Sequence, residues 1–205
     1  MAPAEFFRKH GFWVIDGFLD TQTCAELCRF ARTAPALPAD VVSADGRFVD
    51  QSDRNTWEIS SGYPCADDVA LRVAELRSAL SSHFDVTLDH CEGAKLLAYR
   101  TGGFYRPHVD RITASGEAAA LARARRVSIV IFLNGVSADP GPGEYAGGGL
   151  TFYGLIGDPQ WRQYGFALDP APGLLVAFRS EIVHEVTPVL AGERYTIVDW
   201  FGDAS

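Results

Sequence analysis

The sequence of 205 residues contains no apolar run close to the ~20 residues that a membrane-spanning helix needs. Its first residues, MAPAEFFRKHGFW, lack the charged, apolar and small-residue order of a signal peptide. We therefore expect a cytoplasmic protein with no membrane partner. Lysine is also scarce, with 2 lysines against 16 arginines, and the formal net charge is −8. This acidic balance argues against nucleic acid as the main partner.

The four cysteines form no C-x-x-C pair, which argues against a structural zinc site. Cys24 and Cys28 are one helical turn apart on an apolar face, so we expect them to pack in the core as reduced thiols. The local basic cluster Arg123, Arg125 and Arg126 is interpreted as the solvated entrance to a strand.

We predict a single domain over residues 1–205, because 47% hydrophobic residues can supply a full core. Residues 1–93 are expected to form a helical or mixed support. Apolar spacing predicts helices over 21–34, capped by Asp20, and over about 66–82. The polar segment 40–64 is interpreted as a long loop or irregular hairpin that acts as a lid.

From residue 94 onward the pattern changes to short β-rich runs separated by glycine and proline. Many short strands at such intervals are typical of a sandwich, barrel or jelly roll rather than of a parallel sheet with crossover helices. The expected fold class is therefore mainly β with flanking α-helices, the N-terminal helices packing onto the sheet.

Two H-x-D triplets occur, although five histidines and 16 aspartates predict only about 0.4 by chance. His83 and Asp85 fall at the end of a predicted helix, where side chains two positions apart diverge. His108 and Asp110 lie in a strand-like run, where side chains two positions apart share a face. Only the second triplet is therefore predicted to bind a metal.

A facial iron site needs a second imidazole. His184 is the one remaining histidine in the β-rich region. Taken alone, it is more typical of a satisfied core or surface histidine. Arg194 follows ten residues later, beyond the turn-like segment 188–192, so two adjacent strands could bring both residues into one pocket. A guanidinium there can hold a carboxylate, but a surface ion pair with Glu193 or Glu185 is the competing interpretation.

Five motifs in order carry a family resemblance: YRTGGFYRPHVDR, RRVSIVIFLN, YAGGGLTFYG, PAPGLLVAFRSEIVHEV and GERYTIVDWF. Over residues 94–202 the chain resembles the iron(II)- and 2-oxoglutarate-dependent dioxygenases, and more narrowly the prolyl 4-hydroxylase and oxygen-sensor prolyl hydroxylase branch. The resemblance implies a double-stranded β-helix (jelly-roll, cupin-like) core over 94–202. The implied cofactors and cosubstrates are Fe(II), 2-oxoglutarate and O2, with ascorbate as a candidate reductant.

Residue by residue, the resemblance implies that His108, Asp110 and His184 bind iron. Arg194 would bind the distal carboxylate of 2-oxoglutarate, where collagen-type members use lysine. The cosubstrate-binding tyrosine of the oxygen sensors corresponds here to Phe132, so Tyr99 or Thr196 would supply that contact. The substrate pocket would be formed by Tyr105, Arg125 and Trp200.

The resemblance implies hydroxylation of an aliphatic C–H bond, with a prolyl residue of a peptide or protein as the favoured substrate and succinate and CO2 as by-products. Alternatives are a free amino acid or small natural product, a non-catalytic cupin-like metal-binding module, and a nucleic-acid demethylase. The acidic charge and Trp200 disfavour the last, because the DNA-repair branch has a second arginine at that position. Aromatic candidates for substrate contact are Trp57, Trp161 and Tyr164. We further expect Val127, Ile129, Ile131, Phe178 and Trp200 to keep the pocket dry. The sequence leaves the oligomeric state open.

Overall fold

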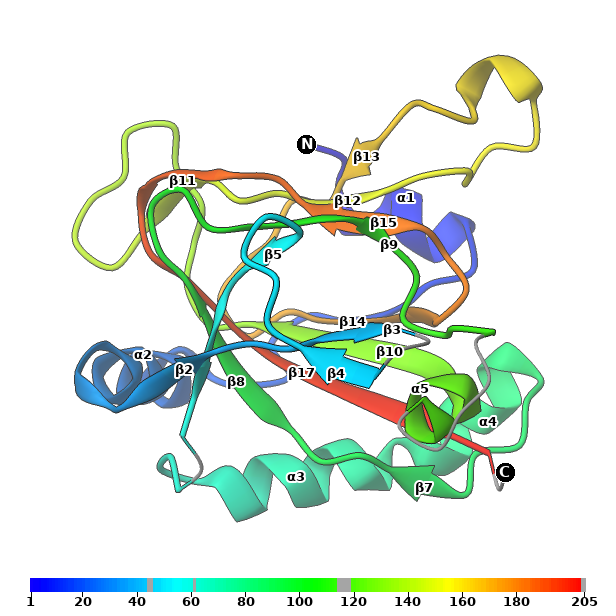
Figure 1. Ribbon diagram of the computed structural model, residues 1–205, viewed down its shortest axis with the longest axis horizontal. Helices are drawn as coiled ribbons and strands as arrows, with labels where there is room; N and C mark the ends of the chain where they lie inside the picture. The colour runs from blue at the N-terminus through cyan, green and yellow to red at the C-terminus, as the bar shows by residue number, and fades with distance from the viewer. Residues whose placement is uncertain (44–45, 61, 114–118, 204–205) are drawn as a thin grey trace.

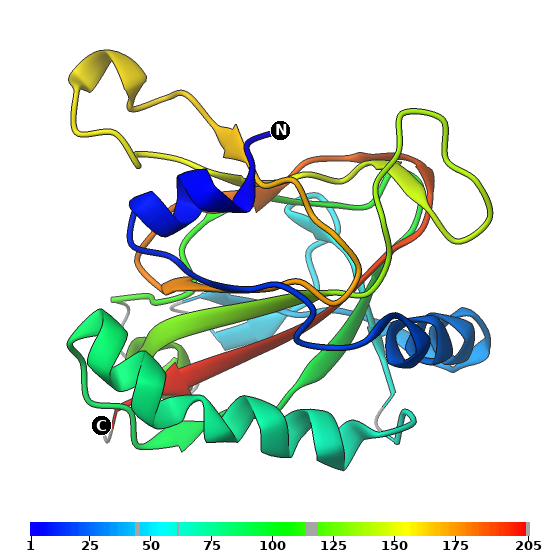
Figure 2. The ribbon, with the colours of Figure 1, turned by 180° about the vertical axis from the view of Figure 1, so that it is seen from behind.

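The computed structural model describes residues 1–43, 46–60, 62–113 and 119–203. Two facing antiparallel sheets make up its body (Figures 1 and 2). The larger sheet has the order β1-β14-β10-β17-β8-β6-β2, with β7 also paired to β17. Its strands are β1 (Trp13–Ile15), β2 (Ala36–Pro38), β6 (Trp57–Ile59), β7 (His90–Cys91), β8 (Lys95–Tyr99), β10 (Arg125–Phe132), β14 (Leu175–Arg179) and β17 (Arg194–Gly202).

The smaller sheet has the order β13-β12-β15-β9-β5 and closes over the larger one. Its strands are β5 (Arg54–Asn55), β9 (Phe104–His108), β12 (Leu150–Phe152), β13 (Phe166–Ala167) and β15 (His184–Val186). Two further pairs complete the β structure: β3 (Val41–Ser43) with β4 (Gly46–Phe48), and β11 (Tyr145–Gly147) with β16 (Val189–Gly192). This is the mainly β, jelly-roll fold predicted from the sequence.

Helices cover the outer face of the larger sheet, as expected. The buried side chains of α2 (Thr21–Thr33), α3 (Ala66–Glu75) and α4 (Arg77–Phe84) form one apolar cluster with that face. By contrast, α1 (Ala4–Lys9) inserts Phe7 between the sheets, and α5 (Ala120–Ala124) directly precedes β10. A single 3-10 turn, η1 (Pro159–Trp161), lies in the long connection from β12 to β13. None of the helices in the described ranges has the length and apolar character required to span a bilayer.

Helix α2 begins where the sequence predicts, because the Asp20 side chain accepts a hydrogen bond of 2.8 Å from the backbone N–H of Thr23. Cys24 and Cys28 are buried in the cluster between helices and sheet, as expected. The helix predicted over 66–82 is instead two helices, α3 and α4, separated at Leu76. No proline or glycine marks this break, so the apolar stripe alone did not reveal it.

The segment 40–64 contributes more regular structure than predicted. Its strand β6 extends the larger sheet beside β8, and its strand β5 extends the smaller sheet beside β9. The segment therefore connects both sheets at one edge of the sandwich, and we call residues 50–59 the edge strap. It brings side chains from the first third of the chain next to the space between the sheets.

Alternation along each central strand separates two apolar clusters. In β17, Tyr195 and Ile197 pack toward the helices, whereas Val198 and Trp200 face the smaller sheet. The expectation that Val127 and Ile131 enclose the pocket is wrong, because both belong to the cluster with the helices and do not line the pocket. Ile129 belongs to the same cluster but also lines the pocket, as expected. Their neighbours in β10, Val130 and Phe132, lie in the inter-sheet cluster together with Phe178. The alternation of side chains along β10 correctly predicted which residues share a face of the sheet. It does not predict whether that face is directed toward the smaller sheet or toward the helices.

Candidate metal centre and binding pocket

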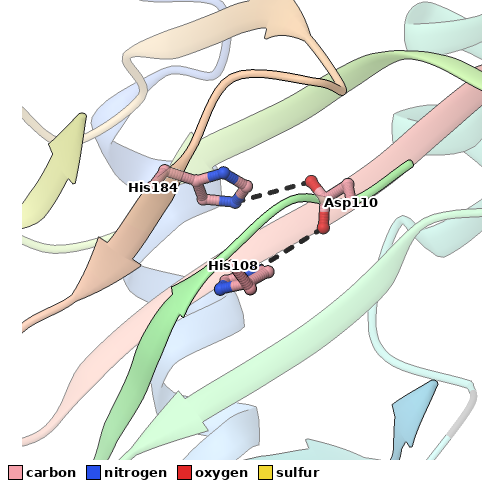
Figure 3. Close-up of side chains that lie close together, drawn as sticks. All are labelled: His108, Asp110 and His184. Carbon is pink, nitrogen blue, oxygen red and sulfur yellow. Dashed lines mark ion pairs between the residues drawn. The ribbon is translucent and has the colours of Figure 1, made fainter. Parts of the chain in front are cut away.

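Two histidines and an aspartate meet between the sheets (Figure 3). His108 ends β9 and lies directly across from His184, the first residue of β15, in the antiparallel pairing of these strands. Asp110 follows just after β9 and is held by its backbone N–H, which donates to the carbonyl of Ser180 at 3.0 Å. The ligand atoms of the three residues all lie within 4.8 Å of one another.

The carboxylate of Asp110 lies between the two imidazoles. One oxygen, Oδ1, is 3.7 Å from His108 Nε2, and the other, Oδ2, is 3.5 Å from His184 Nε2. Ligands at about 2.1 Å from one ion and at right angles to each other are about 3.0 Å apart. The three side chains therefore need only small adjustments to share one ion.

Backbone carbonyls fix the tautomer of both rings. His108 Nδ1 lies 2.8 Å from the carbonyl oxygen of Arg106, and His184 Nδ1 lies 2.9 Å from that of Ile182. Because a carbonyl oxygen only accepts hydrogen bonds, each Nδ1 must carry the proton. This tautomer leaves Nε2, which lies toward Asp110, as the ring nitrogen that can bind a metal.

The charge states suit a divalent metal. Burial and the nearby His108 lower the pKa of His184 to about 4, so its ring is neutral near pH 7. Burial acts to raise the pKa of Asp110, but His184, His108 and Arg125 outweigh this effect and hold that pKa below its usual value. The site thus offers one carboxylate and two imidazoles, the facial donor set of non-haem iron(II) proteins.

Arg194, at the start of β17, is 1% exposed. It forms no ion pair with any carboxylate of the described residues, so the competing surface pair with Glu193 or Glu185 is wrong. Glu193 is 3.8 Å from Arg100, and Glu185 accepts from the Tyr153 hydroxyl. The Arg194 guanidinium is instead enclosed by aromatic rings and by one hydroxyl. Its Cζ lies 4.7 Å from the Tyr99 ring centre and 5.2 Å from that of Phe132, and Nη1 donates to Thr196 Oγ1 at 3.5 Å.

Two buried polar atoms near Arg194 lack hydrogen-bond partners in the described chain: its own Nε and the hydroxyl of Tyr145. Burial raises the pKa of Tyr145, and the charge of Arg194 opposes that rise. Buried polar groups without hydrogen-bond partners are uncommon in folded proteins. Here one of them belongs to Arg194, a cation without a counter-charge, and the other is the nearby Tyr145 hydroxyl. A carboxylate group fits this environment. Tyr145 was missed by the sequence analysis, although it lies in the motif YAGGG.

All nine residues predicted for the site line one pocket between the sheets. They are His108, Asp110, His184, Arg194, Tyr99, Thr196, Tyr105, Arg125 and Trp200. The prediction of how His184 and Arg194 meet is wrong, however. Residues 189–192 form strand β16 rather than a turn, and the two residues face each other from opposite sheets. Of the aromatic candidates, Trp57, Trp161 and Tyr164 do not line this pocket.

One wall of the pocket consists of stacked side chains. Tyr105 stacks on the His108 ring, with centroids 3.5 Å apart and planes inclined by 20°. Arg125 Cζ lies 3.9 Å from the Trp200 ring centre, and its guanidinium is held by both oxygens of Glu92, at 2.5 and 2.8 Å. Two arginines of the basic cluster are therefore in ion pairs rather than free in solvent: Arg125 pairs with Glu92, and Arg126 pairs with Asp203.

Several charged residues of the pocket were missed by the sequence analysis. Arg54 and Glu58 lie in the edge strap, and Asp40 precedes it in the chain. Lys95 is the first residue of β8. Lys95 Nζ lies 3.0 and 3.2 Å from the two carboxylate oxygens of Glu58. No motif marks these positions, because only the pairing of β5 and β6 with distant strands brings them to the pocket.

A jelly-roll core with a two-histidine, one-carboxylate centre beside a buried arginine defines the class of mononuclear metal-dependent oxygenases. The family model described as the 2OG-Fe(II) oxygenase superfamily matches residues 94–202, more than half of the chain. The chain belongs to the 2OG-Fe(II) oxygenase superfamily, whose members use Fe(II), 2-oxoglutarate and O2.

Individual relatives extend this comparison. A PKHD-type hydroxylase of Maricaulis maris is 31% identical over 102 residues, which are 50% of this chain and 38% of that protein. The chain thus spans well under half the length of this curated relative. Two solved structures share the fold. A prolyl-4-hydroxylase of Pseudomonas putida has a TM-score of 0.71 at 24% identity, covering 98% of this chain and 97% of its own. A Trichoplax adhaerens prolyl hydroxylase, in complex with a hypoxia inducible factor peptide fragment, has a TM-score of 0.67 at 19% identity, covering 97% and 86%.

Proposed function

We propose that this protein is an Fe(II)- and 2-oxoglutarate-dependent hydroxylase in which His108, Asp110 and His184 bind the iron. The observation that carries the proposal is the convergence of two imidazole Nε2 atoms and one carboxylate, whose ligand atoms all lie within 4.8 Å of one another. When bound, iron and 2-oxoglutarate supply the activation of O2 that inserts oxygen into a C–H bond, with release of succinate and CO2.

The chain's own residues position these groups. Arg194 would bind the distal carboxylate of 2-oxoglutarate, because it is a buried cation with no carboxylate partner among the described residues. Thr196, Tyr99 and the Tyr145 hydroxyl would complete that contact. A binding module without activity has no need of such a second, buried anion site, so the enzyme is favoured over a cupin-like metal-binding module.

The walls of the pocket would hold the substrate and limit water. Trp200 packs against Arg125 and Tyr105 stacks on His108, so these contacts position both rings on the wall of the pocket. The pocket between these walls opens to solvent, so a side chain of a peptide or a small molecule could enter it. We propose a prolyl residue of a peptide or protein as the substrate, since both structural relatives are prolyl hydroxylases.

Coupled turnover tests this proposal. The purified chain with Fe(II), 2-oxoglutarate and O2 is incubated with proline-containing peptides, and succinate release and a 16 Da gain in peptide mass are measured together. We expect both signals from the wild type and neither from Asp110→Ala. A free amino acid or small natural product that gains 16 Da while all peptides fail would contradict the peptide substrate but not the reaction. Failure of every substrate to promote succinate release would contradict the reaction itself.

A further inference from the structure

The pocket contains four cationic side chains, and two of them are already neutralised. Arg125 is bound by Glu92 and Lys95 by Glu58, each through both carboxylate oxygens. The other two, Arg194 and Arg54, form no ion pair with a carboxylate in the part of the chain that the structure describes. Arg194 has a proposed partner in 2-oxoglutarate. Arg54 is therefore a cation whose partner is still to be assigned.

Arg54 is placed close to the metal centre by the edge strap. Its strand β5 pairs with β9, and Arg54 lies directly across from Tyr105 in that pairing. The Arg54 guanidinium carbon is 4.7 Å from the centre of the Tyr105 ring, and that ring stacks in turn on His108. Arginine, tyrosine and histidine thus form a continuous stack that ends at a proposed iron ligand.

The hydrogen bonds of Arg54 hold it in place without neutralising it. Nη1 donates to the backbone carbonyl of Asp40 at 2.7 Å, a contact that fixes the guanidinium but supplies no negative charge. Nε is buried and has no partner among the described residues. An arginine that is anchored through Nη1 and has no carboxylate partner in the described chain can bind a carboxylate with its remaining N–H groups.

We infer that Arg54 binds a carboxylate of the substrate and so selects substrates that carry one close to the C–H bond that reacts. This inference rests on the proposed function. The carboxylate has two possible sources with the same chemistry: the free carboxyl end of an amino acid or peptide, or an acidic side chain next to the target residue.

Three matched pairs of ligands separate these sources: L-proline with L-prolinamide, a proline-ended peptide with its C-terminal amide, and a capped peptide with Glu or Gln beside the proline. Affinities are measured by calorimetry under anaerobic conditions on the full chain loaded with Fe(II) and 2-oxoglutarate. In at least one pair, we expect the wild type to bind the acid about 10- to 100-fold more tightly than the amide.

Variants assign this preference to Arg54. Arg54→Gln should bring the ratio of acid to amide affinity close to one, and Arg54→Lys should keep part of it because the charge remains. Arg106→Gln is the matched control. Arg106 is an exposed arginine in the adjoining strand that also holds the edge strap, through Ser52 at 2.8 Å, yet it does not line the pocket. This variant should keep the full preference.

The inference is overturned if the wild type prefers no acid in any pair, or if Arg54→Gln retains the preference. The affinity for 2-oxoglutarate, measured on the same samples, reports separately on the proposed function. Absence of 2-oxoglutarate binding in the wild type would contradict that function. Normal 2-oxoglutarate binding without an acid preference would contradict only the role of Arg54.

Discussion

Two buried arginines of the pocket should respond in opposite ways to the same substitution. Arg194 is 1% exposed and has no carboxylate partner in the described chain, whereas Arg125 is 7% exposed and is held by both oxygens of Glu92. Methionine has a similar length and no charge. In protein freed of metal and 2-oxoglutarate, Arg194→Met removes a buried charge without leaving another one unpaired. Arg125→Met leaves the Glu92 carboxylate buried and unpaired.

The magnitudes follow from these environments. Replacing buried charges by apolar side chains of similar volume is neutral or stabilising by about 1–4 kcal/mol, whereas breaking a buried pair costs about 3–5 kcal/mol. For a chain of 205 residues, 1 kcal/mol corresponds to about 2–4 °C in Tm. We therefore expect Arg194→Met to unfold at the wild-type temperature or a few degrees above it, and Arg125→Met to unfold about 6 °C or more below it.

Thermal denaturation with and without ligand measures both effects. With Fe(II) present, 2-oxoglutarate at a hundred times its Kd should stabilise the wild type by about 2.7 kcal/mol. The same addition should not change the Tm of Arg194→Met. Equal destabilisation by both substitutions would refute the distinction between a paired and an unpaired arginine. A full response of Arg194→Met to 2-oxoglutarate would refute the assignment of Arg194 as its binding residue.

Two further predictions concern the scaffold. Gly173 has φ of +82°, and a Cβ there would lie 1.9 Å from the carbonyl oxygen of Leu19, so Gly173→Ala should lower the free energy of unfolding in urea by about 3 kcal/mol. Gly154→Ala, at φ of +71° with open space around it, is the matched control and should cost about 1 kcal/mol; equal losses would show that the contact with Leu19 is unimportant. Burial raises the pKa of Asp199, so its native carboxyl binds a proton more tightly than the unfolded one, and stability should fall as pH rises from about 4 toward the native pKa. Asp199→Asn can keep the oxygen that accepts hydrogen bonds from two backbone N–H groups at 2.7 and 3.0 Å. This variant should flatten the pH dependence of stability, measured as Tm between pH 4 and 7. An unchanged slope would contradict the assignment of this pH dependence to Asp199.

The sequence predicted the residues of the site better than their arrangement. His108, Asp110, His184 and Arg194 were found because their motifs are short, ordered and rich in groups that bind metals or anions. His184 and Arg194 do line one pocket, but the way the chain connects them was predicted wrongly, because no local signal tells whether residues 189–192 turn back within one sheet or cross to the other. Only the long-range pairing of β16 with β11 settles this point.

The residues contributed by the edge strap could not be found from the sequence. Arg54 lies in a strand of two residues within a polar segment, too short to produce a detectable alternation. It reaches the pocket through its pairing with Tyr105, 51 positions away along the chain. Glu92 was missed for a related reason, since its importance depends on a contact with Arg125, 33 positions later. Local patterns identify strands and faces, but tertiary pairing decides which charges meet.

The most direct test of the account is the visible spectrum of the anaerobic protein with Fe(II) and 2-oxoglutarate. A weak metal-to-ligand band should appear in the wild type, disappear in Asp110→Ala and weaken in Arg194→Met. It should remain intact in His83→Ala, which alters the other H-x-D triplet; there His83 Nε2 lies 2.9 Å from the carbonyl oxygen of Gly11, away from the metal centre. Absence of the band in the wild type, or a band that survives Asp110→Ala unchanged, would contradict the proposed iron and 2-oxoglutarate site.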